Sequence, residues 1–309
     1  KGYAMDWAFP KIFETGRHYD AFCVFDADNL VHLDFLAVMN TRLMKGQKVL
    51  QGYLSAKNPV DTWVSGTFAI AFWTVNHLWH LGKYNLGLSS CLGGTGMCIS
   101  ADIVREFGWG CDCLTEDMEF SMKCLSHGIR TCWVHDAIIY DEKPLTFMAS
   151  WRQRKRWAQG QFDCSERYIP ILMKEGFKRH SIVVLDGIMQ LLQNYFLLIS
   201  AFYLVMTYIN MFYPCFTVVL YNDALVPRQF WSVLGTIQYV LPLIVLLQIE
   251  VPAKIYLYWL IYPVFMYSWV PVTFLGWIHR HEKQWVHTIH TRSMQFQAAS
   301  LTRKKEIDS

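Results

Sequence analysis

The sequence is poor in charged residues. Asp, Glu, Lys and Arg make up 17 % of its 309 residues, compared with about 25 % in an average soluble domain. The net charge is only +3, and no run of Lys and Arg suggests a stripe that would bind a phosphate backbone, so we expect no nucleic-acid partner. Most of the charge lies in residues 1–180, while residues 181–278 are nearly free of it. This distribution favours a membrane protein with basic cytoplasmic flanks.

The sequence also lacks the paired CxxC spacing that zinc sites usually show. Its nine cysteines are scattered and do not resemble a disulfide framework. Cys111 and Cys113, with Cys124, His127 and His135 nearby, are the group that invites a metal interpretation. We favour the simpler interpretation that the cysteines are reduced thiols facing the cytosol, several of them acting as small hydrophobic residues.

No initiator methionine and no signal peptide begin the sequence. Lys1 leads directly into a segment that is predicted to be helical. We therefore expect the sequence to be truncated at its N-terminus.

Short apolar strands alternate with helical segments in the first 180 residues. The predicted strands cover residues 21–25, 48–53, the end of the Gly-rich stretch 91–99, and 130–135. The predicted helices cover residues 67–81, 118–127 and 147–161, and Thr115 is the expected N-cap of the second. This alternation predicts an α/β fold with a mainly parallel sheet.

Three long apolar segments follow, and each approaches the roughly 20 residues that a membrane helix needs. They cover residues 182–212, 231–249 and 255–278. We therefore divide the chain into a catalytic part with an interfacial helix (1–180), a transmembrane region (181–278) and a basic cytoplasmic tail (279–309). Lys178, Arg179 and the tail should all stay inside, which requires an even number of crossings. Either a hairpin forms near Pro214, or the last segment does not cross simply.

Two aspartates follow the first predicted strand. Asp26 and Asp28 flank one residue at the carboxyl end of a buried strand, where open α/β sheets place their ligands. Two carboxylates so placed can hold Mg²⁺ or Mn²⁺, which prefer ligation shared with substrate phosphates. A solvated turn is the plain alternative.

A second acidic group begins the helix at 118–127. Asp117 could take a proton from an acceptor hydroxyl as general base, with Glu116 raising its pKa or orienting it. The alternative is ordinary placement of acids at a helix N-terminus.

The helix at 147–161 carries cationic and aromatic side chains. Arg154 and Arg156 could bind phosphate in a forked manner, and Trp157 could pack on a sugar ring next to Gln153. A basic amphipathic helix lying on anionic lipid is the alternative. Further on, Asp186, Gln190 and Asn194 recur near i, i+4 spacing and could line a path through the membrane.

Taken in order, these motifs resemble the processive family 2 glycosyltransferases, which include cellulose, hyaluronan and poly-N-acetylglucosamine synthases. The resemblance covers nearly the whole chain and rests on Asp26-Ala27-Asp28, Gly94-Thr95-Gly96, Thr115-Glu116-Asp117 and Gln153-Arg154-Lys155-Arg156-Trp157. The Q-x-x-R-W signature is its most specific element. Lys1 resembles the Lys of the family's K-x-x-A-(L/M) stretch near the nucleotide, and residues 285–292 resemble the tail of bacterial members.

The resemblance implies an A-type-like catalytic domain followed by interfacial and transmembrane helices. It also implies an inverting, membrane-bound β-glycosyltransferase that uses UDP-N-acetylglucosamine or UDP-glucose to extend a polysaccharide. By this resemblance the metal ligands are Asp26 and Asp28, and the base is Asp117. The substrate-binding residues are Lys1, Gly94, Thr95, Gly96, Glu116, Gln153, Arg154, Arg156 and Trp157.

Other functions remain open at this point. A non-processive enzyme would act on a lipid-linked acceptor, and a membrane transporter or scaffold would use the polar residues of the spans. Family members also carry an earlier strand whose Asp holds uracil. The sequence does not contain it, so we expect these 309 residues alone to bind UDP weakly and to be inactive. The expected location is the cell membrane, with several crossings and a cytoplasmic catalytic domain.

Overall fold

The computed structural model describes residues 1–213 and 228–282. The expected hairpin near Pro214 and residues 283–309 of the basic tail, including the motif at 285–292, lie outside the described residues.

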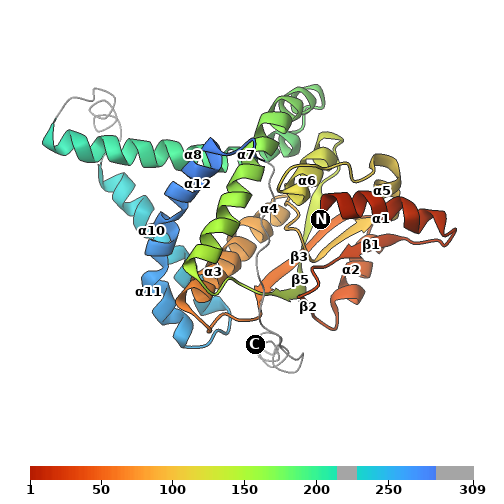
Figure 1. Cartoon of the computed structure of the whole chain (residues 1–309), viewed down its shortest axis with the longest axis horizontal. Coiled ribbons are helices and arrows are strands. Elements are labelled where there is room, and N and C mark those ends of the chain that lie inside the picture. Colours follow the sequence, from red (N-terminus) through yellow and green to blue (C-terminus); the bar gives the residue numbers. More distant parts are fainter. Residues whose placement is uncertain (214–227, 283–309) are drawn as a thin grey trace.

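Helices surround a central sheet (Figure 1). The strands are β1 (Ala21–Val24), β2 (Leu30–Val31), β3 (Val49–Ala56), β4 (Met97–Ser100) and β5 (Thr131–Asp141). The helices before the long apolar segments are α1 (Gly2–Glu14), α2 (Phe35–Met44), α3 (Trp63–Thr74), the π-helix η1 (Val75–His80), α4 (Leu81–Asn85), α5 (Ala101–Phe107), α6 (Glu116–Ser126) and α7 (Phe147–Lys178). The helices that follow are α8 (Ile182–Phe212), α10 (Arg228–Gln248), α11 (Lys254–Tyr267) and α12 (Trp269–Ile278).

The sheet is mixed, and the prediction of a mainly parallel sheet is wrong. In the described chain its strand order is β1-β4-β3-β5-β2, and only the β3–β5 pair is parallel. β4 and β2 run against the other three strands. A buried apolar run reads the same in either direction, so the local sequence carries no sign of a strand's orientation.

One edge of the sheet collects the polar segments. β1 ends opposite the start of β4, and β3 and β5 end together beside the start of β2, while β3 continues from Gln51, opposite the start of β4, to Ala56. We call this edge the sheet margin. Ligand sites of open α/β sheets lie outside the carboxyl ends of the strands, which is the position of this margin.

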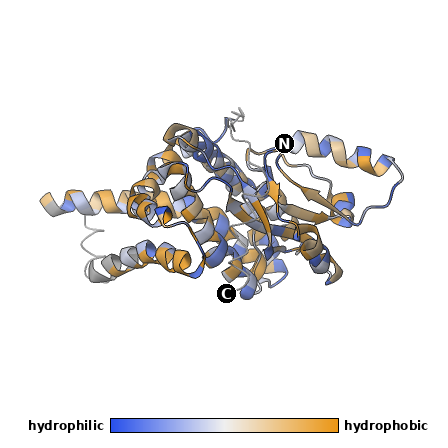
Figure 2. Cartoon of the chain, turned by 90° about the horizontal axis from the view of Figure 1, so that it is seen from below, coloured by the Kyte–Doolittle hydropathy of each residue, from blue (hydrophilic) through white to orange (hydrophobic). Residues whose placement is uncertain are grey.

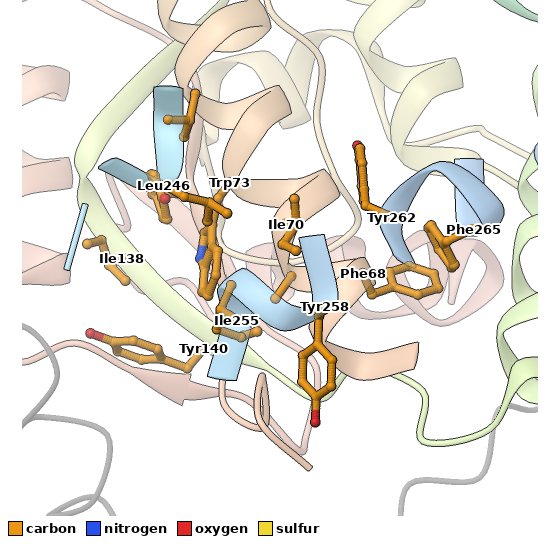
Figure 3. Close-up of a cluster of buried hydrophobic side chains, with 14 of the residues drawn as sticks. Phe68, Ile70, Trp73, Ile138, Tyr140, Leu246, Ile255, Tyr258, Tyr262 and Phe265 are labelled. Carbon is orange, nitrogen blue, oxygen red and sulfur yellow. The ribbon is translucent and has the colours of Figure 1, made fainter. Parts of the chain in front are cut away.

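The largest core cluster joins the sheet to the last helices. Phe68 and Trp73 of α3 pack against β3 and β5 on one side and against Tyr258 and Phe265 of α11 on the other (Figure 3). On the opposite face of the sheet, Phe35 of α2 packs on β3 and β5. Residues of the predicted transmembrane region are therefore part of the same core as the catalytic part.

α7 is longer than predicted and packs along α8. The predicted helix ended at residue 161, whereas α7 continues to Lys178. Thr146 caps its start by accepting a hydrogen bond from the amide of Ala149 (3.2 Å). Close packing requires glycine at the contact: a Cβ on Gly176 would lie 2.5 Å from Cδ2 of Leu185. The second half of α7 is thus stabilised by α8.

The polar stripe of α8 faces the rest of the protein. Lys83 Nζ donates to Asp186 Oδ2 at 2.6 Å and to Gln190 Oε1 at 3.4 Å. Gln161 Nε2 donates to the carbonyl oxygen of Gln190 (3.1 Å), and Asn194 is 8 % exposed. The stripe therefore serves to dock α8 on α4 and α7 in this structure, which gives no support to a transport path.

Two candidate membrane spans lie among the described residues. Ile182–Asn210 and Lys254–Ile278 are long and apolar enough to cross a membrane by length and composition, while the apolar stretch of α10, Gly235–Gln248, is shorter. The helices that extend away from the sheet contain many hydrophobic residues, which are drawn in orange (Figure 2). The last span is divided into α11 and α12 at Ser268.

The contact between α3 and α11 depends on Gly66. A Cβ on Gly66 would lie 2.1 Å from Cδ2 of Tyr258 and 2.9 Å from the carbonyl oxygen of Pro59. Replacing Gly66 with Ala is therefore expected to lower the free energy of unfolding by about 1–3 kcal/mol. Gly82→Ala in α4 is the matched control, because a Cβ there meets nothing within 4 Å. Thermal unfolding measures both variants, and equal melting temperatures would contradict the prediction.

Candidate active site

Residues 25–29 form a segment that crosses the sheet margin. They connect β1 to β2, the two edge strands, and so pass the ends of β4, β3 and β5. The amide of Asn29 donates to the carbonyl oxygen of Asp26 (3.1 Å), and the amide of Asp26 donates back to Asn29 Oδ1 (3.1 Å). This turn leaves the side chains of Asp26 and Asp28 50 % and 28 % exposed. We call residues 25–29 the crossing segment.

The Gly-rich turn, residues 93–96, lies between the two acidic groups. Thr95 Oγ1 accepts the amide of Asp26 (3.0 Å). Gly94 has φ +78°, and a Cβ there would lie 3.3 Å from Asp117 Oδ2. Glycine therefore permits both the backbone conformation and the approach of Asp117. Gly96 also has positive φ and turns the chain into β4.

Gln51 holds the Gly-rich turn, and sequence reasoning did not identify it. Its Nε2 donates to the carbonyl oxygen of Thr95 (3.0 Å), and its Oε1 accepts the amide of Gly93 (2.8 Å). Gln51 is 1 % exposed on β3. A polar residue inside an otherwise apolar strand was the available signal, since a buried amide needs partners.

Lys1 connects the crossing segment to the Gly-rich turn. Its Nζ donates to Asp26 Oδ1 at 2.6 Å and to the carbonyl oxygen of Gly94. The predicted substrate-binding lysine thus lies beside the predicted metal ligand.

Asp117 is set in the first turn of α6. Its Oδ1 accepts the amide of Met118 (2.8 Å). Burial, followed by the neighbouring charge of Glu116, raises the pKa of Asp117 to about 7, although the Met118 amide and Lys1 act in the opposite direction. A carboxylate with a pKa near 7 can exchange a proton at neutral pH.

Thr115 is at the N-cap position of α6 but makes no side-chain capping bond, contrary to the expected cap. It packs against α7 instead. A Cβ on Gly160 would lie 2.7 Å from the backbone nitrogen of Thr115. This close contact brings the start of α6 against α7.

Arg156 of α7 lies close enough to the acidic groups for their charges to act on it. Burial lowers its pKa, while the charges of Glu116, Asp117 and Asp26 oppose that shift. Three carboxylates therefore act on one guanidinium. The structure brings together, from five separate segments, Lys1, Asp26, Gly94, Asp117 and Arg156.

Arg154 lies apart from this group. It is fully buried, donates to Ser268 Oγ (2.8 Å), and its guanidinium carbon lies 4.5 Å and 5.1 Å from the ring centroids of Phe265 and Trp269. Two residues along an α-helix are about 200° apart around its axis, so Arg154 and Arg156 cannot face the same site. In this structure Arg154 connects α7 to α11 and α12.

The other two signature residues of α7 are partly buried. Gln153 Oε1 is buried without a hydrogen-bond partner. The ring of Trp157 meets those of Phe68 and Phe72 at centroid distances of 6.0 Å and 6.2 Å. Trp157 therefore packs against the core side chains of α3.

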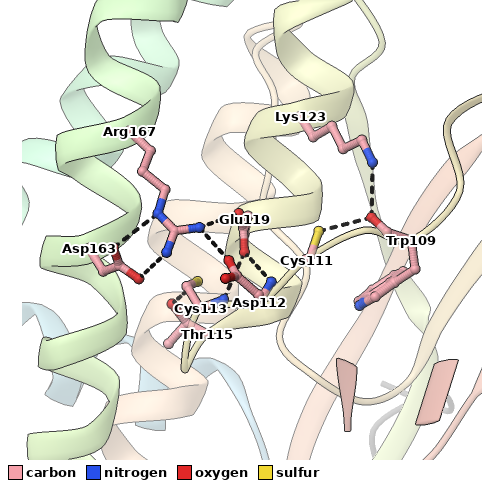
Figure 4. A network of polar contacts seen from close by, with 9 residues as sticks. All are labelled: Trp109, Cys111, Asp112, Cys113, Thr115, Glu119, Lys123, Asp163 and Arg167. Atoms are coloured by element: carbon pink, nitrogen blue, oxygen red, sulfur yellow. Dashed lines mark hydrogen bonds and ion pairs between the residues drawn. The ribbon is translucent and has the colours of Figure 1, made fainter. Parts of the chain in front are cut away.

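An ion-pair network fixes the loop before α6 to α7 (Figure 4). Arg167 pairs with Asp163 Oδ2 at 2.7 Å, with Glu119 Oε1 at 3.1 Å and with Asp112. Glu119 Oε2 accepts the amides of Asp112 and Cys113, each at 2.9 Å. Sequence reasoning missed this network because Arg167 is 55 residues from Asp112 and 48 from Glu119 in the sequence.

The cysteines near this network are bound locally. Cys111 Sγ donates to the carbonyl oxygen of Trp109 (3.1 Å), and Cys113 Sγ lies 3.6 Å from Thr115 Oγ1. Over residues 1–213 and 228–282, no group of three or more His, Cys, Asp or Glu side chains is placed to hold a metal ion.

Asp26 and Asp28 nevertheless suit a shared cation site. They are two partly exposed carboxylates at the sheet margin, and Mg²⁺ is commonly held by one or two carboxylates together with substrate phosphates. The donor set thus fits Mg²⁺ or Mn²⁺ when a diphosphate supplies the remaining oxygens.

The site thus holds acids at the strand ends, a carboxyl group whose pKa is raised, and a nearby arginine on which their charges act. Residues 21–277 match the family described as "Glycosyl transferase family group 2", and the chain belongs to this glycosyltransferase family. Over 144 residues it is 26 % identical to a protein named "Probable glycosyltransferase YdaM" from Bacillus subtilis (strain 168). That match covers 46 % of this chain and 34 % of the relative, so the chain spans about a third of the relative's length. Family 2 enzymes generally use a nucleotide sugar, act with inversion and use a divalent metal.

The raised pKa of Asp117 predicts a pH-dependent stability. The folded state binds the proton more tightly than the unfolded chain, whose pKa is near 3.8. This contribution is present below about pH 4 and is lost as the pH rises through about 7. Asp117→Asn should therefore raise the melting temperature more at pH 8 than at pH 5.

Asp102→Asn is the control, because this side chain is 75 % exposed and should show no such pH dependence. Thermal unfolding at the two pH values measures both variants. A difference between Asp117→Asn and the wild type that is the same at pH 5 and pH 8 would contradict the raised pKa.

Proposed function

We propose that the protein is a membrane-bound, inverting β-glycosyltransferase that transfers a sugar from a UDP-sugar to a growing polysaccharide. The observation that carries this proposal is the set of contacts that joins Asp26 to the Gly-rich turn beside Asp117 at the sheet margin, with the charges of both acids acting on Arg156. Lys1 and Gly94 lie within the same group. Carboxylates for a cation and a base, next to a guanidinium for phosphate, are the groups that this reaction requires.

Asp117 is the proposed general base. Inversion requires an acceptor hydroxyl to attack the anomeric carbon from the face opposite the diphosphate, and a carboxylate takes the proton as the bond forms. A pKa of about 7 suits this task at neutral pH. Glu116 contributes by raising that pKa.

The donor is held by residues from both sides of the site. Asp26 and Asp28 would hold Mg²⁺ or Mn²⁺, which when bound neutralises charge on the diphosphate. Arg156 and Lys1 supply positive charge to the phosphates. The Gly-rich turn lets the acceptor approach the backbone, while Gln153 and Trp157 bind the acceptor end.

The two candidate spans support a place in the cell membrane, with several crossings and the catalytic part in the cytoplasm. α12 packs against α7, and a Cβ on Gly276 would lie 2.5 Å from that of Ala158. The site is therefore connected to an apolar helix, as expected if the product is fed into the membrane. We favour processive extension and UDP-N-acetylglucosamine over UDP-glucose, by likeness to bacterial members.

Transfer to a lipid-linked acceptor is the second candidate, and the same contact between α7 and α12 favours it. Product length separates the two, since processive extension gives long polymers and single transfer gives one added sugar. A thermal-shift panel of UDP-sugars with Mn²⁺ on the full-length protein identifies the donor.

Asp117→Asn is expected to abolish transfer of radiolabelled sugar from the UDP-sugar by the full-length protein, because an amide cannot take the acceptor proton at this position. Binding of UDP and Mn²⁺ should be retained, which calorimetry measures. Polymer formed at the wild-type rate by this variant would rule out Asp117 as the base.

Arg156→Gln is expected to raise KM for the UDP-sugar at least tenfold, since a hydrogen bond to a charged group contributes about 1.5–3 kcal/mol. Arg152→Gln on the same helix is the matched control, because Arg152 is exposed and lies one helical turn before Arg156. Its KM should stay at the wild-type value. Equal KM values for the two variants would remove Arg156 from the donor site.

A further inference from the structure

Lys57 contacts the crossing segment beneath Asp28. It directly follows β3, and its Nζ donates to the carbonyl oxygen of Asp28 at 2.9 Å. The Asp28 carboxylate lies farther away, with Oδ2 at 3.9 Å from Nζ. The Lys57 side chain is 3 % exposed. A buried lysine thus holds the backbone of the segment that carries both proposed metal ligands.

Glu142 is the nearer acidic partner of Lys57. Its Oε2 lies 3.1 Å from Lys57 Nζ, and its side chain is 4 % exposed. β3 and β5 pair in parallel with Ala56 opposite Asp141, so Lys57 and Glu142 are neighbours one residue beyond the strand ends. The register therefore places the two charges together.

The ends of β3 and β5 are also clamped together. The amide of Lys143 donates to Asn58 Oδ1 (2.8 Å), and Asn58 Nδ2 donates to the carbonyl oxygen of Lys143 (2.9 Å). The amide of Lys57 donates to the carbonyl oxygen of Asp141 (2.9 Å). Lys57 and Glu142 thus extend from a rigid platform under the crossing segment.

We propose that Lys57 and Glu142 are positioning residues for the cation site, an inference that rests on the proposed function. Lys57 fixes the backbone of Asp28, and Glu142 balances the charge of Lys57. The ammonium group is then held more closely by Glu142, at 3.1 Å, than by the Asp28 carboxylate, at 3.9 Å, which leaves Asp28 better able to bind Mg²⁺ or Mn²⁺.

The distances predict what happens when the charge of Glu142 is removed. A buried ammonium group needs an anionic partner, and Glu142 and Asp28 are the carboxylates whose distances to it are 3.1 Å and 3.9 Å. Removing the charge of Glu142 leaves the Asp28 carboxylate as the partner of Lys57. Pairing of Asp28 with Lys57 would compete with binding of a divalent cation.

The test is the Mn²⁺ requirement of Glu142→Gln, which preserves the shape of the side chain and removes its charge. We expect the Mn²⁺ concentration for half-maximal transfer to rise about tenfold, since changes behind metal ligands typically weaken metal binding 10- to 100-fold. Binding of Mn²⁺ itself, followed by the electron paramagnetic resonance signal of free Mn²⁺ with UDP present, should weaken by the same factor. At saturating Mn²⁺, kcat should return towards the wild-type value.

Asp141→Asn is the matched control. Asp141 ends β5 at the same margin and pairs with Lys143 at 2.7 Å, so its loss removes a neighbouring ion pair and should leave the Mn²⁺ requirement unchanged. Glu142→Asp keeps the charge but draws it away from Lys57. We expect from it a smaller rise of about threefold, and it supplies the measurement if the glutamine variant does not fold.

An unchanged Mn²⁺ requirement in folded Glu142 variants would overturn the inference, as would an equal rise in Asp141→Asn. All of these variants are made in the full-length protein, and the proposed function fails separately if the full-length wild-type protein transfers no sugar. If wild-type transfer needs Mn²⁺ and Glu142→Gln needs the same Mn²⁺ concentration for half-maximal transfer, only the positioning role is refuted.

Discussion

The connection between the two edge strands is the constraint on which the site depends. β1 and β2 lie at opposite edges of the sheet, so the residues between them must cross the ends of the intervening strands. That crossing carries Asp26 past the Gly-rich turn and Asp28 past the end of β3. Side chains from other strands then hold the crossing segment. The topology of the whole sheet therefore determines where the acidic pair lies. The sequence of the turn that contains the pair is not enough to determine that position.

Charge around the site is arranged in partly buried pairs. Lys1 with Asp26 and Lys57 with Glu142 each join an acid to a base from a distant segment. Burial of these groups costs free energy that the partner and the surrounding hydrogen bonds must offset. Asp117 differs from these ion pairs, because burial and the charge of Glu116 raise its pKa to about 7. The same surroundings that hold the fixed charges thus leave one carboxyl able to exchange a proton.

Prediction from the sequence was most successful for local elements. The strands that became β1, β3 and β5 and the start of α6 follow from short apolar runs and an acidic helix start. The prediction of strand direction was wrong, because a short apolar run gives no indication of the direction in which its strand pairs. The predicted length of α7 was also too short, since the second half of this helix is stabilised by its packing against α8. Arg154 and Arg156 were treated as one pair, although helical geometry turns them to different surroundings.

The sequence by itself determined which residues could carry the chemistry, because acids after a strand and an arginine–tryptophan helix are local patterns with local causes. Only the tertiary structure decided which of them meet. Arg156 lies close enough to the acids for their charges to act on it and Arg154 lies apart from them, while Gln51, Lys57 and Glu142 entered as supporting residues. These contacts join segments far apart in the chain. Their existence depends on strand order and register, which arise from packing of the whole core and from no single stretch of sequence.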